Sequence, residues 1–171
     1  MLVDLISIAP AARVDKLMRL RRRAVALGIE FFGTWDTPFR NLTAESLLRA
    51  SHGFCAAVQG HSLEFNVDGS IKVCSHTTTQ IGHVDTFEDL FEATSSPWLE
   101  LIASRFPGTD AYCAGCAIEG PCGGQCHVTR EVVARAPEDR RRVLFEDMCE
   151  FFRGITHALA VNYLESLPYT A

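Results

Sequence analysis

The hydrophobic pattern of the first 35 residues predicts a strand, a helix and a second strand. Residues 2–9 (LVDLISIA) are largely apolar and stop at Pro10, as expected for a buried strand. Apolar residues then recur at helical spacing over residues 12–27, and Gly28 provides a stop signal. Residues 29–35 (IEFFGTW) predict the second strand. This order makes a right-handed crossover between parallel strands, so the start of the chain resembles the end of a larger β/α layer.

A β-hairpin is the clearest element, over residues 62–74 (SLEFNVDGSIKVC). Residues 67–69 predict a three-residue loop with Gly69 in the left-handed bulge position. The resulting register pairs Leu63 with Val73, Glu64 with Lys72 and Phe65 with Ile71. A two-residue turn would instead place an aromatic ring opposite the lysine, so the three-residue loop is preferred.

The rest of the pattern is mainly helical. Residues 37–49 predict a polar connection that passes into a short helix (LTAESLLRA), for which Thr43 is a plausible cap. Thr86 and Asp89 form a capping box, and Ser96 followed by Pro97 starts another helix. A long amphipathic helix is predicted from about residue 137 to residue 164. Its apolar stripe consists of Leu144, Met148, Phe151, Phe152, Ile155 and Leu159.

Charge and hydropathy narrow the classes of partner. The formal net charge is −5, whereas phosphate binding needs an excess of Lys and Arg. The N-terminus carries Asp4 and no basic lead, unlike a signal peptide, and no apolar run approaches the roughly 20 residues of a membrane-spanning helix. We therefore expect a cytoplasmic protein with neither nucleic acid nor a membrane as partner.

Seven cysteines carry the candidate chemistry, and four of them form the compact run C-x2-C-x5-C-x3-C. The seven are Cys55, Cys74, Cys113, Cys116, Cys122, Cys126 and Cys149. A disulfide framework suits a small secreted domain without a core, but this chain has 171 residues, 47% hydrophobic composition and an odd cysteine number. Thiolates crowded in a glycine-rich loop repel one another, and a metal centre neutralises them.

Two kinds of metal centre remain open from the spacing. Zinc would use Cys113, Cys116, Cys122 and Cys126 as one tetrahedral site and leave the other three cysteines unused. Iron–sulfur clusters would use all seven, as four ligands to one cluster and three to another. A precedent exists for a cysteine run whose last member ligates the other of two clusters.

The complete cysteine pattern resembles a known family. The spacing Cys55-x13-Gly69-x4-Cys74, the four-cysteine run and a cysteine in a downstream helix are similar to the SPASM domain of radical S-adenosylmethionine (SAM) enzymes. The resemblance covers about residues 53–150. Residues 24–42 are similar, more weakly, to the last strands of the partial barrel that precedes SPASM in those enzymes.

The resemblance implies two auxiliary [4Fe–4S] clusters. Cys55, Cys74 and Cys126 would hold the first cluster, and Cys113, Cys116, Cys122 and Cys149 would hold the second. One iron of the first cluster would be left for water, substrate or another side chain, because His52, Gly53 and Phe54 stand where some relatives supply a further cysteine. His52, His76 and His127 lie beside cysteines, but we name none of them as a ligand.

The implied fold is α+β, with a strand–helix–strand remnant of a β/α barrel followed by a SPASM-type domain. This domain has a β-hairpin, a cysteine-rich cluster loop and a long C-terminal helix. The predicted boundaries are residues 1–50 for the barrel remnant, 51–150 for the cluster domain and 151–171 for the rest of the last helix and the tail.

The chain lacks the C-x3-C-x2-C loop that binds SAM in these enzymes, so it cannot cleave SAM by itself. The expected function is electron transfer, substrate binding or both, within an oxidoreductase that modifies peptides or proteins. Its partners would be a peptide or protein substrate and a radical SAM barrel, in the same chain if this one is truncated or in another. The alternative is a zinc-binding structural or peptide-docking module without a redox role.

Overall fold

The computed structural model describes residues 8–42, 53–92 and 96–167. Within these ranges the chain is mostly helical, with one small antiparallel sheet and a long C-terminal helix, as the α+β prediction required. The predicted first strand, residues 2–9, and the short helix after residue 42 lie almost entirely outside the described residues. No helix in the described ranges combines the length and the apolar character needed to cross a membrane.

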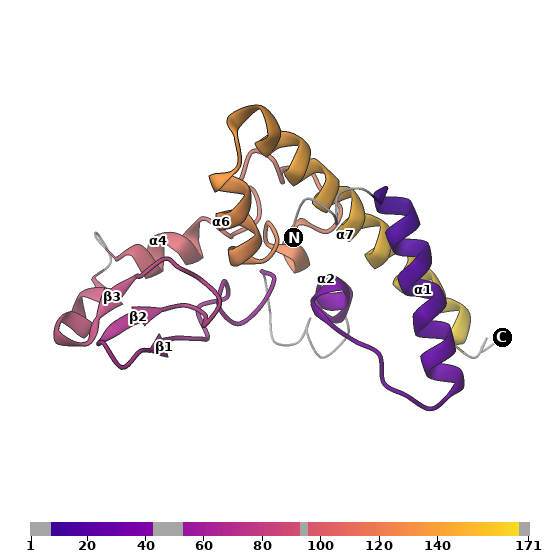
Figure 1. Cartoon of the computed structure of the whole chain (residues 1–171), viewed down its shortest axis with the longest axis horizontal. Coiled ribbons are helices and arrows are strands. Elements are labelled where there is room, and N and C mark those ends of the chain that lie inside the picture. Colours follow the sequence, from indigo (N-terminus) through magenta and orange to yellow (C-terminus); the bar gives the residue numbers. More distant parts are fainter. Residues whose placement is uncertain (1–7, 43–52, 93–95, 168–171) are drawn as a thin grey trace.

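Two long helices run side by side, α1 (Pro10–Ala26) and α7 (Glu138–Ser166), as Figure 1 shows. Both were predicted from their apolar periodicity. Arg13 of α1 forms an ion pair with Asp147 of α7, and Arg21 Nη1 donates to Asn162 Oδ1 at 2.8 Å. The two contacts advance along both helices in the same direction, so the helices are parallel.

Residues 29–35 do not form the predicted second strand. After α1 the chain is irregular as far as the 3-10 helix η2 (Thr34–Asp36), and α2 (Thr37–Asn41) follows where a polar connection was predicted. The side chains of Ile29 and Phe32 are 56% and 65% exposed. A strand requires a neighbouring strand for its backbone hydrogen bonds, and the described strands all belong to a different part of the fold. The strand–helix–strand prediction was therefore wrong at this segment.

The hairpin has the predicted register. Strand β1 (Glu64–Phe65) pairs with β2 (Ser70–Lys72) so that Glu64 faces Lys72 and Phe65 faces Ile71. Gly69 has a φ of 82°, as the bulge position requires. Strand β3 (Gly82–His83), which was not predicted, pairs with the other edge of β2 and completes the order β1-β2-β3.

Shorter helices connect this sheet to α7. They are η3 (Val84–Phe91), α4 (Pro97–Ala103), α5 (Glu119–Cys122) and α6 (His127–Arg135). The start of α4 is as predicted, because Ser96 Oγ accepts from the Leu99 N–H at 3.2 Å. In η3 the prediction was only partly right: the helix is of the 3-10 type, begins before Thr86 and is kinked there.

Two hydrophobic cores organise the fold. The helical core contains Met18, Phe54, Val58, Ile118, Cys122, Phe151, Phe152, Ile155 and Leu159. The sheet core contains Ala57, Ile71, Val73, Ile81 and Leu90. Cys55 packs against both cores. The cysteine-rich segment lies between the sheet and the pair of long helices (Figure 1).

Candidate metal centre

The seven cysteines come from six segments of the fold. Cys113 and Cys116 lie in turns between α4 and α5, and Cys122 is the last residue of α5. Cys126 is the N-cap of α6, and Cys149 lies in α7. Cys55 lies in turns that follow Gly53, and Cys74 follows β2. All seven are free thiols.

Four of the thiols line a single pocket. We call Cys113, Cys116, Cys122 and Cys149 the second cysteine set. Burial raises the pKa of Cys122 to about 12, and the nearby thiols of the same set add to the shift. The pKa of Cys113 is raised to about 11 by burial, by Asp110 and by Cys149. The set that the family resemblance implied for the second cluster is therefore gathered in space.

Among the other three thiols, Cys55 is affected by the remaining two. We call Cys55, Cys74 and Cys126 the first cysteine set. The pKa of Cys55 is raised mainly by burial, and both Cys126 and Cys74 add to this effect. The backbone N–H groups of Ala57 and Val58 act in the opposite direction and lower this pKa. Cys55 is therefore close enough to the other two members for charge on their sulfurs to affect its own.

The structure does not assemble a binding site for a single metal ion from these residues. In the described part of the chain, no three or more His, Cys, Asp or Glu side chains form a group able to hold a metal ion. A zinc ion bound at about 2.3 Å by each sulfur would need such a compact group. The zinc prediction placed Cys126 with Cys113, Cys116 and Cys122, whereas it is Cys149 that lines the pocket with these three. Metal binding by either set stays a prediction.

Three consecutive residues with left-handed backbone turn the chain between Cys122 and Cys126. Gly123, Gly124 and Gln125 have φ values of 51°, 70° and 74°. A Cβ atom on Gly123 would lie 2.3 Å from Gly53 Cα, so the two backbones touch here. This reversal separates Cys122, in the second set, from Cys126, in the first.

Asn41 joins the segments that carry Cys55 and Cys122. Its Nδ2 donates to the carbonyls of Gly53 at 2.9 Å and Pro121 at 2.7 Å. The Gly53 N–H also donates to the Gly120 carbonyl at 2.9 Å. Sequence reasoning missed Asn41, because nothing near it in the sequence signals its partner 80 residues away.

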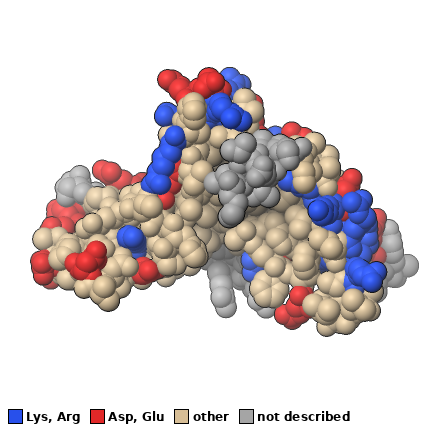
Figure 2. Space-filling model, viewed as in Figure 1, with Lys and Arg blue, Asp and Glu red and all other residues tan. Residues whose placement is uncertain are grey.

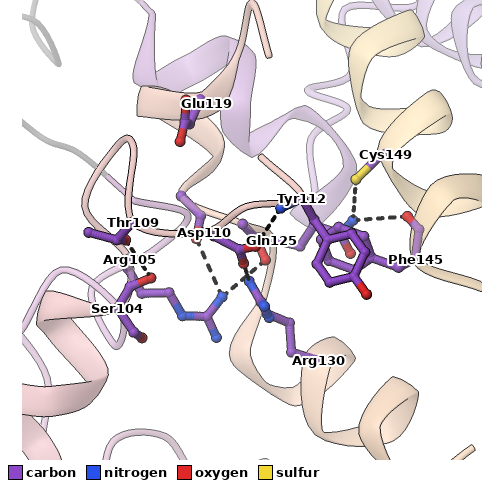
Figure 3. Close-up of polar contacts among 12 residues, drawn as sticks. Ser104, Arg105, Thr109, Asp110, Tyr112, Glu119, Gln125, Arg130, Phe145 and Cys149 are labelled. Carbon is purple, nitrogen blue, oxygen red and sulfur yellow. Dashed lines mark hydrogen bonds and ion pairs between the residues drawn. The ribbon is translucent and has the colours of Figure 1, made fainter. Parts of the chain in front are cut away.

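A buried guanidinium lies between the two cysteine sets. Arg105 is 6% exposed, and its Nη1 donates to the carbonyls of Gly124 at 3.0 Å and Gly123 at 3.4 Å (Figure 3). Burial, with a smaller effect from Arg130, lowers its pKa to about 10, while Asp110 and the thiols of both sets oppose this shift. Sequence reasoning did not identify this residue.

Arg130 and Asp110 form an ion pair beside Arg105 (Figure 3). The Arg130 guanidinium also lies over the Phe145 ring, with its central carbon 5.3 Å from the ring centroid, which is within the range of a cation–π contact. Burial opposes the charged form of Asp110, but the hydrogen bonds from Arg130 and the Tyr112 N–H outweigh it and lower the pKa. This pair fixes the start of the cysteine loop against α6 and α7.

Glu131 of α6 holds the loop that follows Cys74. Its carboxylate accepts hydrogen bonds from the hydroxyls of Thr77 and Thr79 and from the N–H groups of Thr78 and Thr79. Burial opposes ionisation, but these hydrogen bonds together lower the pKa of Glu131 to about 2. Because Cys126 caps the same helix, Glu131 positions two members of the first set.

The three histidines that lie beside cysteines in the sequence have different surroundings. The His76 backbone N–H lies 3.5 Å from Cys74 Sγ. His127 Nδ1 lies 3.3 Å from Arg105 Nη2, and burial and Arg105 lower the imidazole pKa. His52 lies outside the described residues.

Neither the protein-family models nor the curated proteins compared with this chain match it.

Proposed function

We propose that this chain is an iron–sulfur domain that binds two [4Fe–4S] clusters and serves a radical SAM enzyme acting on peptides or proteins. The observation that carries the proposal is the grouping of the thiols. Four line one pocket, and Cys55 responds to the two remaining members of a set of three. A resemblance based on sequence spacing implied the same two sets.

The electrostatics of Arg105 support an anionic group at the site. The hydrogen-bond partners of this buried guanidinium in the described part of the chain are two carbonyls and an imidazole nitrogen, none of which is negatively charged. Asp110 favours the charged form of Arg105 but is itself ion-paired with Arg130, so a further negative charge would offset the cost of burying this guanidinium. Thiolates at Cys113 and Cys126, which already favour the charged form of Arg105, would provide the negative charge.

The residues of each set would have different tasks. A bound cluster would supply one-electron transfer. Ile118 and Phe152 line the pocket of the second set and would limit the access of water to its sulfurs. The first set offers three thiols, so one iron of its cluster would lack a cysteine ligand and would be available to a peptide substrate.

The surface at one end of the long helices fits a missing partner. Exposed apolar side chains gather where α1 ends, and the last turns of α7 carry more of them. They include Val25, Leu27, Ile29 and Phe32, and Tyr163 and Leu164. Lys and Arg side chains cover α1, while Asp and Glu are more frequent over the sheet (Figure 2). We assign this apolar surface to contact with a radical SAM barrel, either in the same chain or in another. A C-x3-C-x2-C motif encoded upstream of Met1 would show that the barrel belongs to the same chain.

Metal analysis tests the proposal. After anaerobic purification and reconstitution, we expect about eight irons per chain with matching sulfide. Changing Cys149 to Ala should remove about half of both, because only the second set loses a ligand. Met148→Ala, a change at the neighbouring part-buried position of α7, should leave the iron content unchanged.

Two results would overturn the proposal. Stoichiometric zinc without sulfide would favour a zinc-binding structural module with no redox role. Equal loss of iron in the Cys149 and Met148 variants would mean that the helix, and not the thiol, determines cluster content.

A further inference from the structure

Gln125 is held in an unusual position between the two cysteine sets. Its side chain is completely buried, at 0% exposed. Among the described residues it is the one non-glycine residue with a positive φ, 74°. A residue with a Cβ atom adopts this conformation at a cost, so the surrounding structure must hold it there.

The buried amide points toward a sulfur of the second set. Gln125 Nε2 donates to Cys149 Sγ at 3.1 Å and to the Phe145 carbonyl at 3.5 Å (Figure 3). The carbonyl can only accept, so an amide turned the other way would place two acceptors against each other. The contact with α7 therefore orients the N–H of Gln125 toward Cys149.

The backbone of the same residue contacts a second member of the set. The Gln125 N–H donates to the Cys122 carbonyl at 3.1 Å and also lowers the pKa of the Cys122 thiol, 27 residues before Cys149 in the chain. In the first set, by contrast, the donors are backbone N–H groups: those of Ala57 and Val58 lower the pKa of Cys55, and the His76 nitrogen lies 3.5 Å from Cys74 Sγ. Gln125 thus supplies a side-chain donor whose removal leaves the backbone donors of both sets in place.

The amide oxygen of Gln125 indicates that this residue does more than fill space in the core. Oε1 is buried and has no hydrogen-bond partner in the described part of the structure. A glutamine that only filled space would be replaced at lower cost by an apolar residue of similar size. An N–H donor to an anionic sulfur is what leucine or methionine could not provide.

We propose that Gln125 is a positioning residue that holds Cys122 and Cys149 together and raises the reduction potential of the cluster bound by the second set. The inference rests on the proposed function. When a low-potential one-electron donor reduces a cluster, one negative charge is added and shared with its thiolates. Hydrogen bonds to sulfur stabilise that charge, so they favour the reduced state.

The test is a redox titration of the reconstituted full chain with sodium dithionite, followed by electron paramagnetic resonance. The signal that survives in Cys149→Ala identifies the first cluster. In Gln125→Leu we expect the midpoint potential of the second cluster to become more negative, with iron content and the first cluster unchanged. Gln59→Leu is the matched control, because Gln59 Nε2 donates to the Gly53 carbonyl at 3.1 Å instead of to sulfur.

A second variant covers the case in which leucine prevents folding or cluster loading. Gln125→Asn accepts the left-handed backbone more readily but is too short to reach Cys149, so it too should lower the potential of the second cluster. Unchanged potentials in a fully loaded variant, or equal shifts of both clusters, would overturn the role of Gln125 and leave the proposed function intact. Absence of iron and sulfide from the unaltered chain would overturn both.

Discussion

The two cysteine sets are built in different ways. Three members of the second set lie within ten consecutive residues, 113–122, and α7 supplies the fourth. The first set takes one member each from the turns after Gly53, the end of the hairpin and the start of α6. Short spacing can be recognised in a sequence, whereas the first set depends on contacts between distant segments.

The sets also differ in their surroundings. Cys122 belongs to the helical core, and Cys116 packs against it. Cys74 packs against the sheet core, Cys126 packs against the helical core, and Cys55 contacts both cores. Damage to the helical core should therefore expose Cys122 before Cys74, and damage to the sheet core should expose Cys74 before Cys122.

The largest effects are expected from cavities in the two cores. Ile155 and Ile71 are both 0% exposed, so replacing either with Ala should lower the free energy of unfolding by about 2–5 kcal/mol. Urea unfolding of the reduced, metal-free protein measures this loss. In alkylation followed by mass spectrometry, Ile155→Ala should accelerate labelling of Cys122, and Ile71→Ala that of Cys74. As a control, valine at either position should lower the free energy of unfolding by only about 0.5–1.5 kcal/mol. Identical labelling patterns in the two alanine variants would contradict the separation of the cores.

A smaller effect is expected at the contact between the two backbones. Alanine at Gly123 must adopt a φ of 51° and places its Cβ 2.3 Å from Gly53 Cα. Gly115 is the matched control, because its φ is 80° and a Cβ there would have no atom within 4 Å. We expect Gly115→Ala to cost about 1–2 kcal/mol from the left-handed conformation alone, and Gly123→Ala to cost more in the same urea measurement. Equal losses would show that the Gly53 segment moves away freely.

The smallest effect concerns Glu131 and depends on pH. Glu131→Gln should lower the free energy of unfolding by about 2 kcal/mol at pH 7, because charged hydrogen bonds to Thr77 and Thr79 are lost. The pKa of Glu131 falls from an ordinary 4.5 to about 2 on folding, so its stabilisation is complete above pH 4.5 and is lost as the pH falls toward 2. Unfolding measured across this range should show the two proteins converge in acid.

Glu146→Gln is the control for this prediction, since the Glu146 ion pair with Arg142 is exposed. Its effect should stay below about 1 kcal/mol. A constant difference between Glu131→Gln and the unaltered protein from pH 7 to pH 2 would contradict the assignment of the low pKa.

Local patterns predicted the elements that depend on neighbouring residues. The Asp68-Gly69 turn and the alternating apolar residues were enough to predict the hairpin register. Periodicity predicted both long helices, and Ser96 with Pro97 predicted the start of α4. For residues 29–35 the apolar run favoured a strand, but a strand also needs a partner that the run itself cannot supply.

The candidate site could be predicted only in part. The sequence pointed to the cysteines through their spacing, and a family resemblance divided them into two sets. Gln125, Arg105 and Glu131 went unnoticed because their roles depend on contacts with residues 18 to 54 positions away. Gln125 did carry one weak signal, since it interrupts a glycine-rich turn immediately before Cys126.

The position of α7 also has a consequence for the order in which the protein is made. Ribosomes release the chain from its N-terminus, so every member of the first set has been synthesised by residue 126, whereas the second set waits for Cys149. The same helix closes the helical core against α1, through contacts that span 134 and 141 positions. Completion of the four-thiol pocket and closure of the core therefore fall together, after the first set has been synthesised, and the second set stays incomplete until the fold can shield it.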